Sequence, residues 1–113
     1  MFTEVLEHIA VTDPQVILAD IHRVLRIGGR LILSTPNVAN VGNILALARG
    51  ENIFWPPPKF YGSTDRHNRE FTPSELCELL ERSGFSTYEL GYMSRGRRSR
   101  WSRLTRAANA SRL

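Results

Sequence analysis

The chain has 113 residues, 42% of them apolar, which allows one domain with a single modest core. Its apolar runs are too short to span a membrane, and Glu4 and Glu7 stand where a signal peptide would be basic and then apolar. Cys77 is the sole cysteine, which excludes an internal disulfide and a cysteine-based zinc site and favours a reducing, cytoplasmic setting. The net charge of +4 is uneven, because residues 95–113 hold seven arginines and no acidic residue.

A helix and a strand are predicted in the first third of the chain. The pair Asp13-Pro14 supplies an N-cap and a proline at the first helical position, and Gly28-Gly29 supplies a stop. Apolar residues recur between them at helical spacing and form the expected buried face, namely Ile17, Ile21, Val24 and Leu25. The apolar run 31–33 then predicts a short strand that is buried on both faces of a sheet.

Two further helices and a strand are predicted in the rest of the chain. Apolar spacing indicates a helix within residues 38–50, and Thr72 with Glu75 forms a capping box that begins the next helix. The alternating stretch 85–93 predicts a strand. Residues 51–72, which we call the lid segment, have the composition of a long loop, and such a loop inside a compact domain is usually functional.

This order of elements favours an α/β fold. Strands and helices alternate along the chain, which is typical of a mostly parallel sheet flanked by helices. We therefore expect one α/β domain over residues 1–94 and a separate arginine-rich tail over residues 95–113. The spacing of Trp101, Leu104 and Ala108 in the tail fits an amphipathic helix, while disorder and a nucleic-acid contact are the alternatives.

Two stretches of the chain resemble a known family. The run EVLEHIAVTDPQVILADIHRVLRIGGRLILSTPN, together with HNREFTPSELCELLERSGF, is similar to the second half of class I S-adenosylmethionine-dependent methyltransferases and covers residues 2–93 roughly. The resemblance implies the C-terminal portion of a Rossmann-like methyltransferase fold, in which residues 4–8 end the fourth strand and the N-terminal strands are missing. It also implies that the arginine-rich end stands where family members have a closing antiparallel strand.

The same resemblance limits what the chain offers to the cofactor. Family members bind S-adenosylmethionine mainly against the earlier strands, beside a glycine-rich turn that does not occur in this sequence. Only Thr3, Glu4 and Leu6 are then expected as cofactor contacts. We expect the chain by itself to bind the cofactor too weakly to measure, to be inactive alone, and to associate with a missing N-terminal half, a partner chain or a second copy of itself.

The segment EVLEH and a later histidine imply a metal site by the same resemblance. Small-RNA 2′-O-methyltransferases and some quinone-biosynthesis enzymes use Glu-x-x-Glu-His as metal ligands, and the RNA enzymes add a later His, which matches Glu4, Glu7, His8 and His67. Carboxylate and imidazole ligands suit Mg²⁺, Mn²⁺ or Fe²⁺, and His8 and His67 would then also be the catalytic residues. The alternative is a segment without a metal, in which Glu7 starts a turn and His8 is a hydrogen-bonded wall residue.

Acceptor contacts are expected from Asn37 after the predicted strand and from Trp55 and Tyr61 in the lid segment. Asn37 also fits a helix entry, and the aromatic residues also fit a structural role in the lid segment. The implied reaction is methyl transfer to an oxygen of a small molecule, quinone, glycan or RNA, in which the enzyme mainly positions the two reactants. The alternative is a noncatalytic binding module, or a partner-dependent half-domain that contacts RNA through its basic tail.

Overall fold

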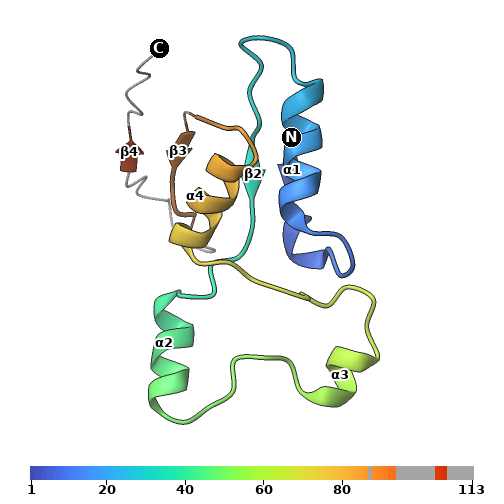
Figure 1. The fold of residues 1–113 in the computed structure, drawn as a ribbon. Coiled ribbons are helices and arrows are strands. Elements are labelled where there is room, and N and C mark those ends of the chain that lie inside the picture. The colour runs from blue at the N-terminus through green and yellow to red at the C-terminus, as the bar shows by residue number, and fades with distance from the viewer. Residues whose placement is uncertain (87, 94–103, 107–113) are drawn as a thin grey trace.

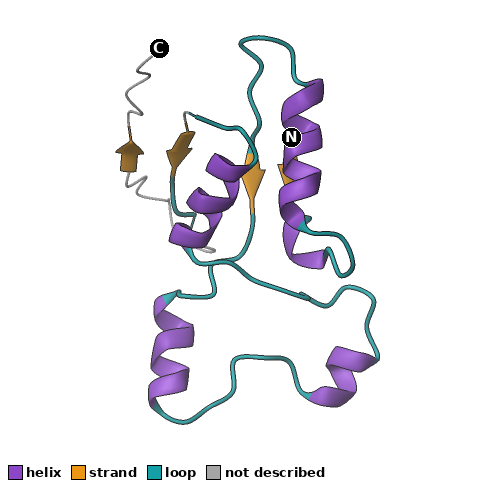
Figure 2. Cartoon of the chain, in the orientation of Figure 1, coloured by secondary structure: helices purple, strands orange, loops and turns teal. Residues whose placement is uncertain are grey.

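The computed structural model describes residues 1–86, 88–93 and 104–106 (Figures 1 and 2). Its elements, in chain order, are β1 (Phe2–Thr3), the 3₁₀ helix η1 (Leu6–His8), α1 (Pro14–Val24), β2 (Leu33–Ser34), α2 (Val41–Ala48), α3 (Pro57–Tyr61), α4 (Pro73–Arg82), β3 (Tyr88–Leu90) and β4 (Leu104–Arg106). The helices predicted near residues 14–25, 38–50 and 72–84 are present as α1, α2 and α4. The lid segment contains one further helix, α3, which begins within its run of prolines.

A parallel β–α–β unit forms the first part of the structure. β1 and β2 pair in parallel, with Phe2 opposite Leu33, and α1 connects them. Asp13 caps α1 as predicted, because its side chain accepts a hydrogen bond from the Gln15 backbone N–H (2.8 Å). The parallel arrangement is confirmed for this pair, although β2 overlaps the predicted strand 31–33 at one residue only.

The observed sheets differ from the single, mostly parallel sheet that the sequence predicts. β3 and β4 form an antiparallel pair, with Leu90 opposite Leu104. The described strands therefore form two separate two-stranded sheets. A strand antiparallel to β3 is thus present, and the predicted helix through Leu104 is wrong for residues 104–106. The strand conformation lets their backbone groups pair with one edge of β3, which a helix could not do. The predictions for the rest of the tail (95–103 and 107–113) fall outside the described residues.

The core lies where η1, α1 and α4 meet. Its buried apolar side chains are Leu6, Leu18, Phe71, Leu76 and Leu80. Leu18 is the fully buried residue of α1, whereas Val24, predicted to be buried, is 69% exposed and Ile21 is only partly buried. α1 therefore buries a narrower face than its apolar pattern indicates, because α4 packs against one side of it only.

The segment around β2 is not buried on both of its faces. Ile32 is 64% exposed, and α2 buries none of its side chains, so the predicted burial of 31–33 on both faces is wrong. Figure 1 shows the reason, since α2 and α3 lie apart from α1 and α4 and are joined by extended segments. Within the described ranges, no helix has the length and apolar character needed to cross a membrane.

α4 begins with the predicted capping box. Thr72 Oγ1 accepts a hydrogen bond from the Glu75 N–H (3.2 Å), and the Glu75 carboxylate accepts one from the Thr72 N–H (2.8 Å). This backbone hydrogen bond and a second bond from the Thr72 hydroxyl lower the pKa of Glu75, because both favour the charged carboxylate. Gly84, just beyond the helix, has a φ of 98°, which glycine adopts without strain. Local chemistry thus defines both ends of the helix that carries much of the core.

Thr72→Ala should lower the free energy of unfolding by about 1 kcal/mol at neutral pH, because it removes the hydroxyl of the N-cap. The pKa of Glu75 is lower in the folded state than its ordinary value of 4.5, so the ionised carboxylate stabilises the fold. This contribution to the free energy of unfolding is fully present above pH 4.5 and is lost as the pH falls through the pKa of the folded state. Since Thr72→Ala removes one cause of this depression, it should also flatten the loss of stability in acid. Urea unfolding followed by circular dichroism at several pH values measures both effects.

Ser86→Ala is the matched control, because Ser86 is exposed and lies outside the cap. It should change the free energy of unfolding by less than about 0.5 kcal/mol. Equal stability of Thr72→Ala and the wild type at neutral pH would show that the capping box does not stabilise the chain.

Candidate functional site

η1 follows a sharp change of direction at the end of β1. Glu4 has a φ of 53°, in the left-handed region that residues other than glycine seldom occupy. η1 then buries Leu6 and Glu7, which are 1% and 0% exposed, and leaves His8 partly exposed. A single 3₁₀ turn therefore carries one apolar and one acidic side chain into the interior.

The Glu7 carboxylate is buried without a full set of partners. Its Oε2 accepts a hydrogen bond from Thr35 Oγ1 (3.0 Å), while Oε1 has no hydrogen-bond partner in the described part of the chain. His8 Nε2 lies 4.0 Å from Oε1. A buried carboxylate oxygen without a partner is costly, because it has lost its hydration without compensation. Such an atom needs a further partner, which can be a hydrogen-bond donor, an ordered water or a cation.

Two histidines present free ring nitrogens to the same space. His8 Nδ1 lies 3.1 Å from the Arg66 carbonyl oxygen, and His67 Nδ1 lies 2.7 Å from Glu70 Oε1. Since a carbonyl and a carboxylate oxygen only accept, each Nδ1 carries the proton and donates, which leaves Nε2 of the neutral ring as an acceptor. Metal-binding histidines commonly make this outer hydrogen bond, which orients the ring toward the ion.

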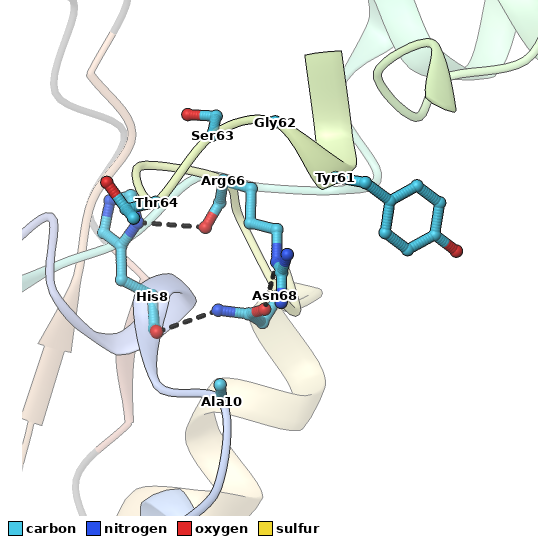
Figure 3. A pocket seen from close by; sticks show the side chains of 8 residues that line it. All are labelled: His8, Ala10, Tyr61, Gly62, Ser63, Thr64, Arg66 and Asn68. Carbon is cyan, nitrogen blue, oxygen red and sulfur yellow. Dashed lines mark hydrogen bonds between the residues drawn. The ribbon is translucent and has the colours of Figure 1, made fainter. Parts of the chain in front are cut away.

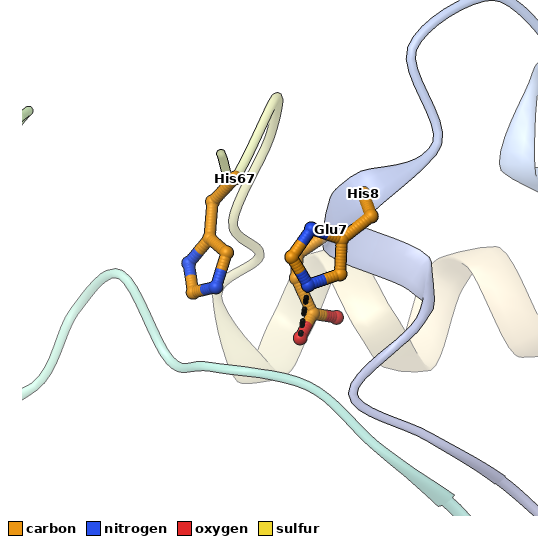
Figure 4. Close-up of side chains that lie close together, drawn as sticks. All are labelled: Glu7, His8 and His67. Carbon is orange, nitrogen blue, oxygen red and sulfur yellow. Dashed lines mark ion pairs between the residues drawn. The ribbon is translucent and has the colours of Figure 1, made fainter. Parts of the chain in front are cut away.

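Glu7, His8 and His67 converge, and we call them the triad (Figure 4). Each offers a ligand atom, and these atoms lie within 4.8 Å of one another. The His8 and His67 rings meet edge to face, with their centroids 5.0 Å apart. One carboxylate oxygen and two imidazole nitrogens form a ligand set that fits a divalent cation and leaves coordination positions for further ligands.

The end of the lid segment is fastened to η1 by hydrogen bonds. The Asn68 N–H donates to the Glu7 carbonyl (2.7 Å), and the Asn68 side-chain amide donates to the His8 carbonyl (2.9 Å). Trp55 stacks against the His67 ring, with the two centroids 6.1 Å apart. These contacts hold His67 beside η1, so that segments about 60 positions apart in sequence form one site.

An open pocket of about 360 Å³ adjoins the triad (Figure 3). It is lined by His8, Ala10, Tyr61, Gly62, Ser63, Thr64, Arg66 and Asn68. Figure 3 shows the Arg66 side chain running toward Asn68, whereas the Tyr61 ring points away from both, and Tyr61 is 78% exposed. Tyr61, predicted as an acceptor contact, therefore borders the pocket without placing its ring inside it.

The residues predicted around β1 do not join the triad. Glu4 lies outside the cluster of ligand atoms, because its Oε1 accepts a hydrogen bond from Ser34 Oγ (2.7 Å) of the neighbouring strand. The Leu6 side chain is in the core, which leaves only its backbone for a cofactor. Thr3 lies in β1 and is partly buried. The structure thus brings together three of the four predicted metal ligands.

Two predicted acceptor residues have partners within the protein. Asn37 Oδ1 accepts a hydrogen bond from the Ala39 N–H (2.9 Å) in the turn before α2, as expected of a helix entry. Trp55 packs against His67, and Lys59 Nζ lies 4.2 Å from its ring centroid. Neither Asn37 nor Trp55 lines the pocket, and their contact with an acceptor stays a prediction.

Sequence reasoning missed the groups that support the triad. Thr35, Glu70 and the Arg66 carbonyl each hold one triad side chain. Glu70 leaves a signal in the sequence, since an acidic residue three positions after a candidate histidine ligand can orient the ring. Thr35 and Arg66 leave none, because they meet Glu7 and His8 across 28 and 58 positions of the chain.

Comparisons with known proteins identify the family of this chain. A family model described as a methyltransferase domain matches residues 1–90. The chain is also 35% identical over 81 residues to a ubiquinone biosynthesis O-methyltransferase of Aeromonas salmonicida (strain A449), and the match spans 72% of this chain and 32% of that relative. No solved structure matches the chain. The chain therefore belongs to the class I S-adenosylmethionine-dependent methyltransferases.

Proposed function

We propose that the chain forms the acceptor side of an enzyme that transfers the methyl group of S-adenosylmethionine to a hydroxyl oxygen, with a divalent cation bound by the triad. The observation that carries this proposal is the buried Oε1 of Glu7, which has no hydrogen-bond partner among the described residues and lies beside two imidazole nitrogens. The name of the relative, an O-methyltransferase, supports oxygen as the atom that is methylated.

The triad would hold Mg²⁺ or Mn²⁺ through Glu7 Oε1 and through the Nε2 atoms of His8 and His67. When bound, such an ion orients acceptor hydroxyls and favours their deprotonated form, which is the better nucleophile for methyl transfer. The protein's own part is to fix the ligands. Thr35 holds the second Glu7 oxygen, and Glu70 sets the tautomer and orientation of His67.

The described residues do not by themselves provide a site for S-adenosylmethionine. The sequence contains no G-x-G turn, and of the three residues expected near the cofactor, Leu6 is in the core and Glu4 is bonded to Ser34. Thr3, in β1, is the remaining residue of this chain that we expect to contact the cofactor. We therefore assign the chain to the acceptor side of the enzyme.

Removal of the metal should stop methyl transfer in the complete enzyme. Excess chelator should abolish the transfer of labelled methyl from S-adenosylmethionine to catechol, an acceptor with two adjacent hydroxyls, and Mn²⁺ should restore it. His67→Ala should lower the rate by about 100-fold or more, while cofactor affinity stays unchanged, because the triad holds the acceptor side. Scintillation counting gives the rate, and calorimetry gives the affinity for the cofactor.

Glu78→Gln is the matched control, because Glu78 forms an exposed ion pair with Arg82 on α4 (2.7 Å). Its methyl-transfer rate should equal that of the wild type. Full activity in excess chelator together with a silent His67→Ala would mean that the triad is a structural cluster, and the proposed metal-dependent function would then be wrong.

Glu7→Gln should have opposite effects on metal affinity and on stability. The amide cannot supply an anionic ligand, so the Mn²⁺ affinity of the 113-residue chain should fall at least about tenfold. Without metal, the free energy of unfolding should rise by about 1 kcal/mol, because an unpaired buried charge is removed while the acceptor for Thr35 is kept. Calorimetric titration with MnCl₂ and urea unfolding measure the two quantities.

Glu4→Gln provides the comparison within the same segment, because Glu4 is exposed and its carboxylate already accepts a hydrogen bond from Ser34. Its Mn²⁺ affinity should change by less than about twofold, and its free energy of unfolding should change by less than about 0.5 kcal/mol. A metal-free Glu7→Gln chain that is less stable than the wild type would contradict the view that Glu7 is retained for a cation.

A further inference from the structure

The pocket beside the triad carries a single permanently charged side chain. Of its lining residues, Arg66 is the only one whose side chain is charged at every physiological pH. The lining contains no carboxylate. Its remaining polar side chains belong to Ser63, Thr64, Asn68 and Tyr61, and the Tyr61 ring points away. The pocket is therefore positive, and it offers hydroxyl and amide donors around its one cation.

Arg66 is oriented but has no anionic partner in the described part of the chain. Its Nε donates to Asn68 Oδ1 (3.1 Å), and its guanidinium lies 5.1 Å from the Phe60 ring centroid. Four other arginines form ion pairs with carboxylates, namely Arg23, Arg49, Arg69 and Arg82. Asp65 is adjacent to Arg66 in sequence, but its side chain is exposed and makes no ion pair with it. The terminal Nη groups of a partly buried guanidinium thus remain available for an external anion.

The pocket and the triad share one residue, His8. His8 lines the pocket and also supplies a triad nitrogen, and the Arg66 carbonyl is the acceptor that orients the His8 ring. A molecule in the pocket therefore lies against His8, the one triad residue of the lining, and against Arg66. The pocket volume of about 360 Å³ is in the range for small-molecule sites.

We propose that the methyl acceptor is a small hydroxylated molecule that carries a carboxylate, with its hydroxyls at the triad and its carboxylate on the Arg66 guanidinium. This inference rests on the proposed function and names the acceptor class. A carboxylate has one negative charge and two coplanar oxygens, which match the donor edge of one guanidinium. An RNA end would instead need several cations along its phosphates, and the pocket lining has one.

Two probes that differ only in the carboxylate test this assignment. We expect the Mn²⁺-loaded chain to bind 3,4-dihydroxybenzoate at least about tenfold more tightly than catechol, as measured by calorimetry. Arg66→Gln should abolish this preference and leave the affinity for catechol unchanged within about threefold. Arg23→Gln is the matched control, because Arg23 is an exposed arginine of α1 outside the pocket, and it should keep the full preference.

Mn²⁺ affinity reports whether the Arg66→Gln site is intact, since the triad depends on the carbonyl of Arg66 and not on its side chain. Arg66→Lys should keep part of the preference, because it keeps the charge without the planar donor edge. Should Arg66→Gln lose Mn²⁺ binding, the comparison of the two probes on the wild type and on Arg66→Lys decides the question. Equal affinity of the wild type for both probes would overturn the proposal.

Two further measurements separate this inference from its alternatives. The dinucleotide uridylyl-3′,5′-uridine has a terminal diol and a phosphodiester, and Arg66-dependent binding tighter than that of 3,4-dihydroxybenzoate would overturn the small-molecule assignment. Benzoate titrated into the metal-free chain should shift the NMR signals of the Arg66 Nε–H and of the Asn68 side-chain amide. Shifts that vanish in Arg66→Gln would support the anion site even if the triad proved to bind no metal, whereas unshifted signals would contradict it.

Discussion

The burial of the Glu7 carboxylate is the constraint on which the rest of the site depends. Glu7 shares η1 with Leu6, so the turn that anchors the core also carries a charged group inside. Its backbone carbonyl accepts hydrogen bonds from Asn68 (2.7 Å) and Arg69 (3.3 Å), which fasten the lid segment to η1. Because Glu7 Oε1 has no hydrogen-bond partner among the described residues, the proposed cation would compensate its buried charge. Glu7 therefore affects both the stability of the chain and the proposed binding of a metal.

Arg66 links the triad to the pocket through two different parts of one residue. Its carbonyl orients His8, while its side chain lies between Asn68 and Phe60 at the pocket wall. The two tasks are chemically separate, yet a shift of the lid backbone would displace both groups together. The packed part of the structure fixes η1, whereas α2 and α3 bury no side chains and lie apart from it (Figure 1). The triad and the pocket both take their residues from the region of η1 and from the lid segment.

The sequence by itself determined the features that depend on near neighbours. The cap at Asp13 and the capping box of Thr72 and Glu75 are hydrogen bonds within one helical turn, so the residue types and their spacing are sufficient to predict them. The family also followed from ordered motifs, and the resemblance included Glu7, His8 and His67 among the metal ligands. Two of these are adjacent in the chain, and the structure brings the third to them.

Only the tertiary structure decided which of the predicted residues share a site. Glu4 is three positions from Glu7, but the left-handed turn of its backbone directs it to Ser34 on the neighbouring strand. Leu104–Arg106 form a strand because the edge of β3 is there to pair with them. Arg66 acquired its role by meeting His8 across 58 positions. Spacing along the chain specifies hydrogen bonds within a turn, whereas contacts between distant segments depend on how the helices and strands pack, which no local pattern encodes.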